Sequence, residues 1–139
     1  MGKLEGDFTG KLLKKYRTKR PNAVVLKIAD RITLGVPDFA IIDFGYTSWW
    51  EAKVLRDRDA WNLRGLGKGI QHTNAMNIAE QGRCFYVVFV DCTNDKSILL
   101  VDPRDVNITN PIETVDDHDY VTFVEKMIIH HAPLPGVND

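Results

Sequence analysis

Two carboxylates and a lysine lie close together in the segment from Gly35 to Lys53. Asp38 and Glu51 are thirteen positions apart, and Lys53 follows Glu51 by two positions. Hard divalent cations such as Mg²⁺ prefer oxygen ligands of this kind and usually leave other coordination positions to water and substrate phosphate. These residue types therefore predict a cation site that handles a phosphate group, provided that the fold brings them together.

A β-hairpin would bring them together. Apolar runs at 39–42 and 49–50 flank the segment Phe44-Gly45-Tyr46-Thr47, a pattern typical of two strands joined by a turn. Folding about Phe44-Gly45 places Asp38 opposite Glu51, with their Cβ atoms about 5 Å apart. Period-two alternation puts Glu51 and Lys53 on one face of their strand. The three charged groups are therefore expected to converge.

An ordinary exposed pair on an edge strand is the structural alternative for Glu51 and Lys53. Against it, Trp50, Ala52 and Val54 fill the other face of the same strand, which is typical of an interior strand. Like charges directly opposite one another destabilise a hairpin, and charges on an interior strand need partners. A bound cation together with Lys53 would offset this repulsion, so we favour a functional site.

The elements that position the site follow from hydrophobic periodicity. Helices are expected over 4–17, 70–81 and 120–131, the second ending at Gly82 and the third showing the clearest amphipathic stripe. Strands are expected at 23–28, 37–42, 49–55, 84–90 and 98–101, with loops over 56–69 and 103–117. The order α-β-β-β-α-β-β-α predicts an α/β or α+β layered domain.

Length and composition point to one intracellular domain. The chain has 139 residues, of which 44% are hydrophobic and 27% charged, as in soluble globular proteins. No apolar run approaches a membrane span, and the N-terminus lacks a secretory apolar core, so a cytoplasmic protein is expected. Cys84 and Cys92 flank one expected strand, and their spacing suggests neither a disulfide nor a zinc site.

Charge is distributed unevenly along the chain. Residues 1–20 contain seven Lys/Arg against two acidic residues, whereas residues 91–139 contain three against ten. A basic N-terminal segment suggests a polyanionic partner on one side of the molecule. A solvated amphipathic helix with lysines on its wet side explains the same charges equally well.

The strings Gly35-x-Pro37-Asp38 and Glu51-Ala52-Lys53 resemble the motif of the PD-(D/E)xK nuclease superfamily. They lie on a hairpin after an N-terminal helix and before a helix that contains Gln71. Within the superfamily, the chain is most similar to VRR-NUC and Holliday-junction-resolvase-like nucleases, many of them from phages or bacteria. The resemblance implies a restriction-endonuclease-like α-β-β-β-α-β core, with a central mixed sheet flanked by helices. This core would occupy residues 4–101 of a single nuclease domain, followed by an acidic loop and an extra C-terminal helix over 102–132.

By this resemblance, Asp38, Glu51 and the backbone carbonyl of Ala52 would hold Mg²⁺, for which Mn²⁺ could substitute. Lys53 would orient or help deprotonate the attacking water, or stabilise the developing negative charge.

Two helical residues complete the implied site. Gln71 would position the lysine, the water or a phosphate oxygen. Glu5, from the first helix, would hold a metal-bound water or a second ion, with nearby Asp7 as the alternative match.

The implied activity is metal-dependent endonucleolytic hydrolysis of DNA, selective for branched structures such as Holliday junctions. A restriction-like or repair nuclease acting on duplex, flap or single-stranded ends is an alternative, and a catalytically silent DNA-binding module of the same fold is another. Symmetric cleavage would require a homodimer. No nucleotide cofactor is expected, because Gly65-Leu-Gly-Lys-Gly69 does not fit a phosphate-binding loop. The expected phosphate contacts are Lys14, Lys15, Arg56, Arg58, Arg64 and Lys68.

Aromatic residues and histidines have plainer expected roles. Trp49 and Trp50 are expected in the core and at its rim. His72 is expected to be exposed on its helix, with a phosphate contact as the alternative. His130 and His131 end an amphipathic helix, where histidine suits the helix dipole, so metal ligation is not favoured.

Overall fold

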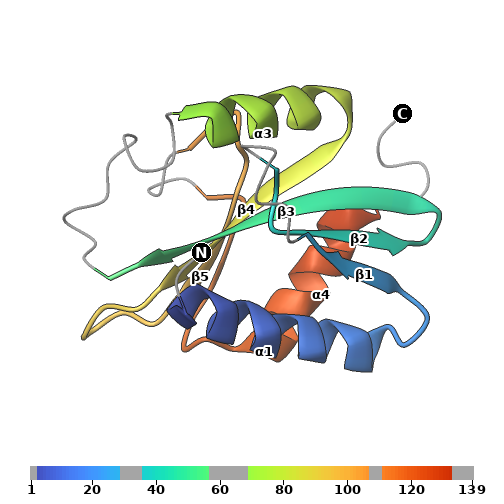
Figure 1. The fold of residues 1–139 in the computed structure, drawn as a ribbon. Helices are drawn as coiled ribbons and strands as arrows, with labels where there is room; N and C mark the ends of the chain where they lie inside the picture. Colours follow the sequence, from blue (N-terminus) through green and yellow to red (C-terminus); the bar gives the residue numbers. More distant parts are fainter. Residues whose placement is uncertain (1–2, 29–35, 57–68, 107–110, 133–139) are drawn as a thin grey trace.

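A computed structural model describes residues 3–28, 36–56, 69–106 and 111–132, with the backbone but not the side chains of 3–5 and 69–71. Three helices and six strands occupy these residues, an α/β arrangement as the sequence predicts (Figure 1). In chain order they are α1 (Lys3–Lys19), β1 (Val24–Lys27), β2 (Phe39–Asp43), β3 (Tyr46–Leu55), α3 (Gly69–Gln81), β4 (Arg83–Val90), β5 (Ile98–Val101), β6 (Glu113–Val115) and α4 (Tyr120–His131).

The strands form one mixed sheet in the order β1-β2-β3-β4-β5-β6. β3 and β4 are parallel, and each of the other neighbouring pairs is antiparallel. A parallel pair needs a long crossover connection, and α3 lies in the segment that joins β3 to β4. β3 therefore lies inside the sheet, as its apolar alternate positions predict.

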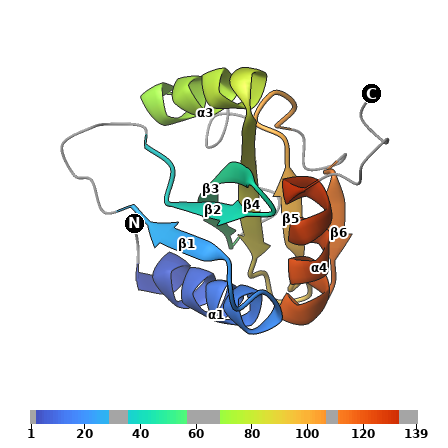
Figure 2. The ribbon, with the colours of Figure 1, turned by 90° about the vertical axis from the view of Figure 1, so that its right-hand side faces the viewer.

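Helices cover both faces of this sheet. Figure 2 shows α1 and α4 together on one face, which we call the α1/α4 face, and α3 on the other, the α3 face. Leu12 and Leu13 of α1 share the larger buried cluster with Trp50 and Phe123. The smaller cluster, under α3, includes Ala75 and Ala79 with alternate residues of β4. The core is thus two apolar layers separated by the sheet.

The apolar stripe of α4 closes the core. Phe123, Val124 and Met127 are buried in the larger cluster, so the stripe packs within this chain. Asp119 precedes the helix, and its carboxylate accepts a hydrogen bond from the Thr122 N–H at 3.1 Å. This is the capping role that aspartate serves before the first helical turn.

One strand lies where the sequence predicts a loop. β6 falls inside the 103–117 segment and pairs with β5, for example Val115 with Ile98. It has three residues, of which Val115 is buried, so it is too short to produce an alternating pattern. β3 also begins at Tyr46 rather than Trp49, because the turn before it occupies only two residues.

Within the described ranges, no helix has the length and apolar character needed to cross a membrane. Cys84 and Cys92 are free thiols, as their positions around one strand predict.

Candidate functional site

The β2–β3 hairpin has the register that the sequence predicts. Phe39 pairs with Trp50, and Asp43 pairs with Tyr46. The two turn residues, Phe44 and Gly45, have φ values of 56° and 81°. Positive φ at both central residues is typical of a type I′ turn, whose twist matches that of antiparallel strands. A short local turn therefore fixes the pairing along the whole hairpin.

Asp38 directly precedes β2, one step beyond the Phe39–Trp50 pair. Extending the register by one residue sets Asp38 opposite Glu51. The backbone holds Asp38 on both sides. Its carbonyl accepts a hydrogen bond from the Ile28 N–H at 2.9 Å, and its carboxylate Oδ2 accepts one from the Ala52 N–H at 2.8 Å. The Asp38 carboxylate is therefore fixed against β3 beside Glu51.

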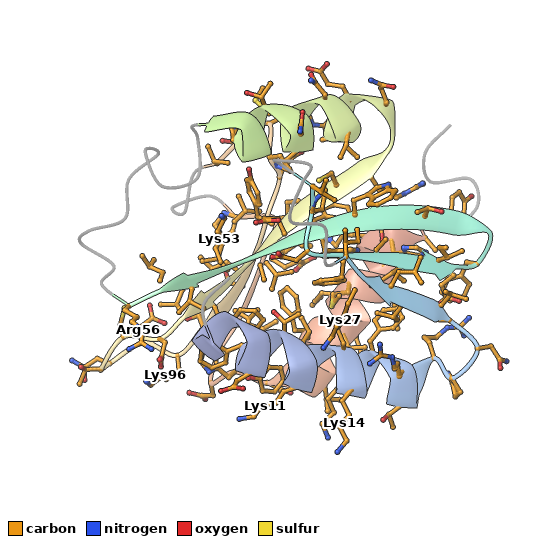
Figure 3. The ribbon with its side chains drawn as sticks, viewed as in Figure 1. Lys11, Lys14, Lys27, Lys53, Arg56 and Lys96 are labelled. Carbon is orange, nitrogen blue, oxygen red and sulfur yellow. The ribbon has the colours of Figure 1, made fainter. Side chains whose placement is uncertain are left out.

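Glu51 and Lys53 lie on the α3 face of β3. Trp49 and Leu55, which share their alternation, pack against the cluster under α3, whereas Trp50 packs in the cluster on the other face. Glu51 is only 3% exposed, and the Lys53 Nζ lies 3.4 Å from its Oε2 atom. Figure 3 shows Lys53 on the α3 side of the sheet. Limited access to water strengthens the attraction within this pair.

Tyr86 and His72 lie behind Glu51. Tyr86 is the partner of Glu51 across the parallel β3–β4 pair, and its hydroxyl lies 2.9 Å from the His72 Nδ1. Burial raises the pKa of Tyr86, and the charge of Glu51 raises it further, so the phenol stays protonated. Burial lowers the pKa of His72, which favours a neutral imidazole. The inner wall of the site is therefore uncharged.

The expectation that His72 is exposed is wrong, because the residue is buried at 9% exposure. His72 shares the spacing i, i+3, i+7 with Ala75 and Ala79, and this line of α3 packs on the sheet. That spacing is the sequence signal that could have predicted its burial. The pairing of Tyr86 with Glu51 has no local signal, because it depends on the crossover between β3 and β4.

The donor set suits a hard divalent cation. It comprises the carboxylates of Asp38 and Glu51, with the Ala52 backbone beside them, and oxygen atoms of this kind are the usual Mg²⁺ ligands. In the part of the chain that the structure describes, no group of three or more His, Cys, Asp or Glu side chains could hold a metal ion. Mg²⁺ commonly binds through one or two carboxylates plus water and phosphate, so two carboxylates meet its needs.

Other predicted site residues are only partly described. Gln71 lies in the first turn of α3 and Glu5 in α1, but their side chains lie outside the described residues, as do Arg58, Arg64 and Lys68. Lys14 and Lys15 are exposed on α1, and Figure 3 shows Lys14 on the opposite side of the molecule from Lys53. Arg56 is exposed directly after β3. The structure thus brings Asp38, Glu51 and Lys53 together and leaves Lys14 and Lys15 on the α1/α4 face.

A second polar network lies at the turn of the hairpin. The guanidinium of Arg20 donates two hydrogen bonds to Asp43, at 3.0 and 3.1 Å, and the Tyr16 hydroxyl donates a third at 3.0 Å. His131 is fully buried. Its Nδ1 lies 2.6 Å from the Ser48 Oγ, and its Nε2 donates to the Asp43 carbonyl at 2.8 Å. Each group has a structural partner, so this network joins α1, α4 and the hairpin.

No protein-family model matches the chain, and no curated protein has significant sequence similarity to it. The likeness to PD-(D/E)xK nucleases therefore depends on the motif residues and the geometry described above.

Proposed function

We propose that the chain is a metal-dependent nuclease that hydrolyses phosphodiester bonds in DNA. The supporting observation is the joint position of Asp38 and Glu51 across the hairpin, with the Lys53 ammonium 3.4 Å from Glu51 on the same face. A helix, a three-stranded antiparallel unit, a crossover helix and a parallel strand surround this group. That order agrees with the restriction-endonuclease-like core that we propose for this fold.

Asp38, Glu51 and the Ala52 carbonyl would hold Mg²⁺ or Mn²⁺, which, when bound, acidifies a coordinated water and offsets negative charge on the phosphate. The chain supplies the other requirements. The bond from the Ala52 N–H holds the Asp38 carboxylate at one orientation. The uncharged Tyr86 and His72 exclude water from the inner side of Glu51.

Lys53 supplies the positive charge. Its side chain is 29% exposed, so its long aliphatic stem is largely shielded while the ammonium can meet a phosphate that approaches from solvent. Negative charge grows on the phosphoryl oxygens during attack, and a fixed ammonium stabilises that charge more strongly where water is excluded. Before a substrate binds, the Glu51 carboxylate holds the Lys53 ammonium at this position.

The preferred substrate follows from the family resemblance. Holliday junctions and other branched DNA are the substrates we propose, cut inside the cell by a homodimer that presents two such sites. Duplex, flap or single-stranded ends are the alternative substrates. A silent DNA-binding module would have no use for two opposed carboxylates and a lysine at one position, because these charges cost stability.

A cleavage assay tests the proposal. Labelled four-way junction, flap, single-stranded and duplex DNA would be incubated with Mg²⁺, Mn²⁺ or EDTA. We expect cleavage only with metal, and a loss of about a hundredfold or more in Lys53→Ala and Asp38→Ala. The matched control is Lys96→Ala, which removes the lysine of an ion pair with Asp91 in an exposed turn and should cleave normally.

Three outcomes would contradict parts of the proposal. Absence of cleavage on every substrate with either metal would exclude a nuclease of this type. If junction binding persisted without cleavage, the silent DNA-binding module would be the correct interpretation. Cleavage that survived both Lys53→Ala and Asp38→Ala would place the active site elsewhere.

A further inference from the structure

A cavity of about 440 Å³ lies beside the candidate site, between α3 and the sheet. Asn74, Asn77, Ile78 and Gln81 line it from α3, at the spacing i, i+3, i+4, i+7 that places residues on one side of a helix. Trp49 and Pro37 line it from the sheet side. The cavity volume is within the range of small-molecule sites, which is about 300–1,000 Å³.

The cavity adjoins the proposed catalytic residues along the chain. Trp49 precedes Glu51 by two positions on β3 and faces the same side, so their Cα atoms are about 7 Å apart. Pro37 is the residue immediately before Asp38. A phosphate at Asp38, Glu51 and Lys53 would therefore lie next to the opening, and an adjacent nucleotide could enter it.

The chemistry of the lining fits a flat heterocycle. Trp49 offers an aromatic surface, and Pro37 and Ile78 add aliphatic contacts. The three amides, Asn74, Asn77 and Gln81, each carry both hydrogen-bond donors and an acceptor, which match the polar edge of a nucleobase. None of the described lining residues carries a formal charge, so this lining suits an uncharged ring better than a phosphate.

Exposure differs across the three amides. Asn77 and Gln81 are exposed, whereas Asn74 is half-buried. A ring that entered the cavity would lie against Trp49 and reach the amides with its edge. Because stacking on an aromatic side chain tolerates any base, this arrangement recognises an unpaired base more than its sequence.

We propose that this cavity binds one unpaired nucleobase of the strand whose phosphate occupies the Asp38–Glu51–Lys53 site. This inference rests on the proposed nuclease function and adds the source of its selectivity. A base inside a duplex must be unstacked and unpaired before it can enter, whereas a base at a branch point, flap or single strand enters at lower cost. The cavity would thus favour substrates with an unpaired nucleotide next to the cleaved bond.

Binding measurements in EDTA test the cavity without the need for hydrolysis. Fluorescence anisotropy would compare a single-stranded oligonucleotide with versions in which one abasic residue is moved stepwise along the strand. For the wild-type protein, we expect one abasic position to weaken binding about tenfold, because base stacking on an aromatic side chain is lost. In the double variant Asn77→Ala/Gln81→Ala, the intact strand should bind less tightly, and the abasic penalty should fall below about threefold.

Two further variants sharpen the result. Trp49→Phe keeps an aromatic surface and should retain most of the abasic penalty. Asn94→Ala removes an exposed amide in the turn after β4, outside the cavity, and should behave as wild type. A wild-type protein indifferent to the abasic residue at every position would overturn the proposal. The same holds if Asn77→Ala/Gln81→Ala weakens binding of intact and abasic strands equally.

The cavity and the nuclease can fail separately. Lys53→Ala should lose cleavage in Mg²⁺ but keep the abasic penalty in EDTA. If the wild type shows the penalty without cleaving DNA, the base site stands and the nuclease assignment is wrong. If it cleaves intact and abasic strands at equal rates, and the cavity variants do the same, the nuclease stands and the base site is wrong.

Discussion

Glu51 is a carboxylate kept away from water by the surrounding fold. It is 3% exposed, and Tyr86, its partner on the neighbouring strand β4, is uncharged. Transfer of a charge into such a place costs free energy that an ion pair with a partly exposed lysine only partly recovers. Residues with this property are common at functional sites, where stability is sacrificed for a charge that the chemistry needs.

Glu51→Gln should therefore stabilise the protein when metal is absent. The amide keeps the shape of the side chain and removes both the buried charge and its repulsion with the Asp38 carboxylate, while the partly exposed Lys53 ammonium keeps its contact with water. We therefore expect the free energy of unfolding to rise by on the order of 1 kcal/mol in EDTA. Added Mg²⁺ should raise the melting temperature of the wild type, because it binds the folded state, and should leave Glu51→Gln unchanged. Differential scanning fluorimetry in EDTA and in Mg²⁺ measures both effects.

Glu113→Gln is the control for that experiment. Glu113 also forms ion pairs, with Lys126 and His130, but its side chain is 25% exposed. We expect neither stabilisation in EDTA nor a loss of the Mg²⁺ response. A lower melting temperature for Glu51→Gln in EDTA would show that Glu51 stabilises the fold rather than being tolerated by it.

At the scale of elements, the hairpin turn sets the register that aligns Asp38 with Glu51. Gly45 has a φ of 81°, in the region that disfavours side chains, although a Cβ there would meet no other atom within 4 Å. Gly45→Ala should therefore lower the free energy of unfolding by about 1–2 kcal/mol through backbone strain alone. Gly10 lies inside α1, where a Cβ likewise meets nothing within 4 Å, so Gly10→Ala should raise it by about 0.5–1 kcal/mol.

Urea denaturation of the two alanine variants checks this pair of predictions. The same chemical change should shift the midpoint in opposite directions, with similar slopes. Equal effects of the two substitutions would contradict a cost that arises from the positive φ of Gly45.

The elements also show which features a sequence can predict. The Phe44-Gly45 turn and the alternation of Trp50 and Ala52 are local signals, so the hairpin register and the joint position of Glu51 and Lys53 could be predicted. The contact of His72 with Tyr86 and the short strand β6 could not, because each depends on a partner distant in the sequence. The cavity beside Trp49 has no local signal either, since it exists only where α3 crosses the sheet.

At the scale of the whole molecule, the uneven charge of the chain is partly balanced by packing. α1, which is rich in lysine, lies beside α4 (Figure 2). The Lys19 Nζ lies 3.8 Å from the Glu125 Oε1. Both side chains of that pair are about half exposed, so its contribution to stability is small. Lys14 and Lys15 lie exposed on the α1/α4 face, while the proposed catalytic residues and the cavity lie on the α3 face.

The network that joins α1, α4 and the hairpin should make stability depend on pH. Burial lowers the pKa of His131, and the positive charge of nearby Arg83 lowers it further. The hydrogen bond to the Asp43 carbonyl and the negative charge of Asp43 raise this pKa, but the net shift is downward. Burial also lowers the pKa of His72. An unfolded histidine titrates near pH 6.5, so below that pH the unfolded chain binds protons that the folded chain does not. The free energy of unfolding should therefore fall as the pH drops from about 7 to about 5.

The Asp43 carboxyl should affect stability in a separate, lower pH range. Burial by itself would raise the pKa of its carboxyl, but hydrogen bonds from Arg20 and Tyr16 outweigh this effect and lower it. Its contribution to stability is present above about pH 4, which is near the pKa of an aspartate in the unfolded chain, and is lost at lower pH.

Melting temperatures followed by circular dichroism from pH 8 to pH 3 should therefore fall in two stages. His131→Gln should flatten the first stage, and Arg20→Gln the second. A melting temperature that rose from pH 7 to pH 5, or a first stage unchanged in His131→Gln, would contradict the role of the buried histidine.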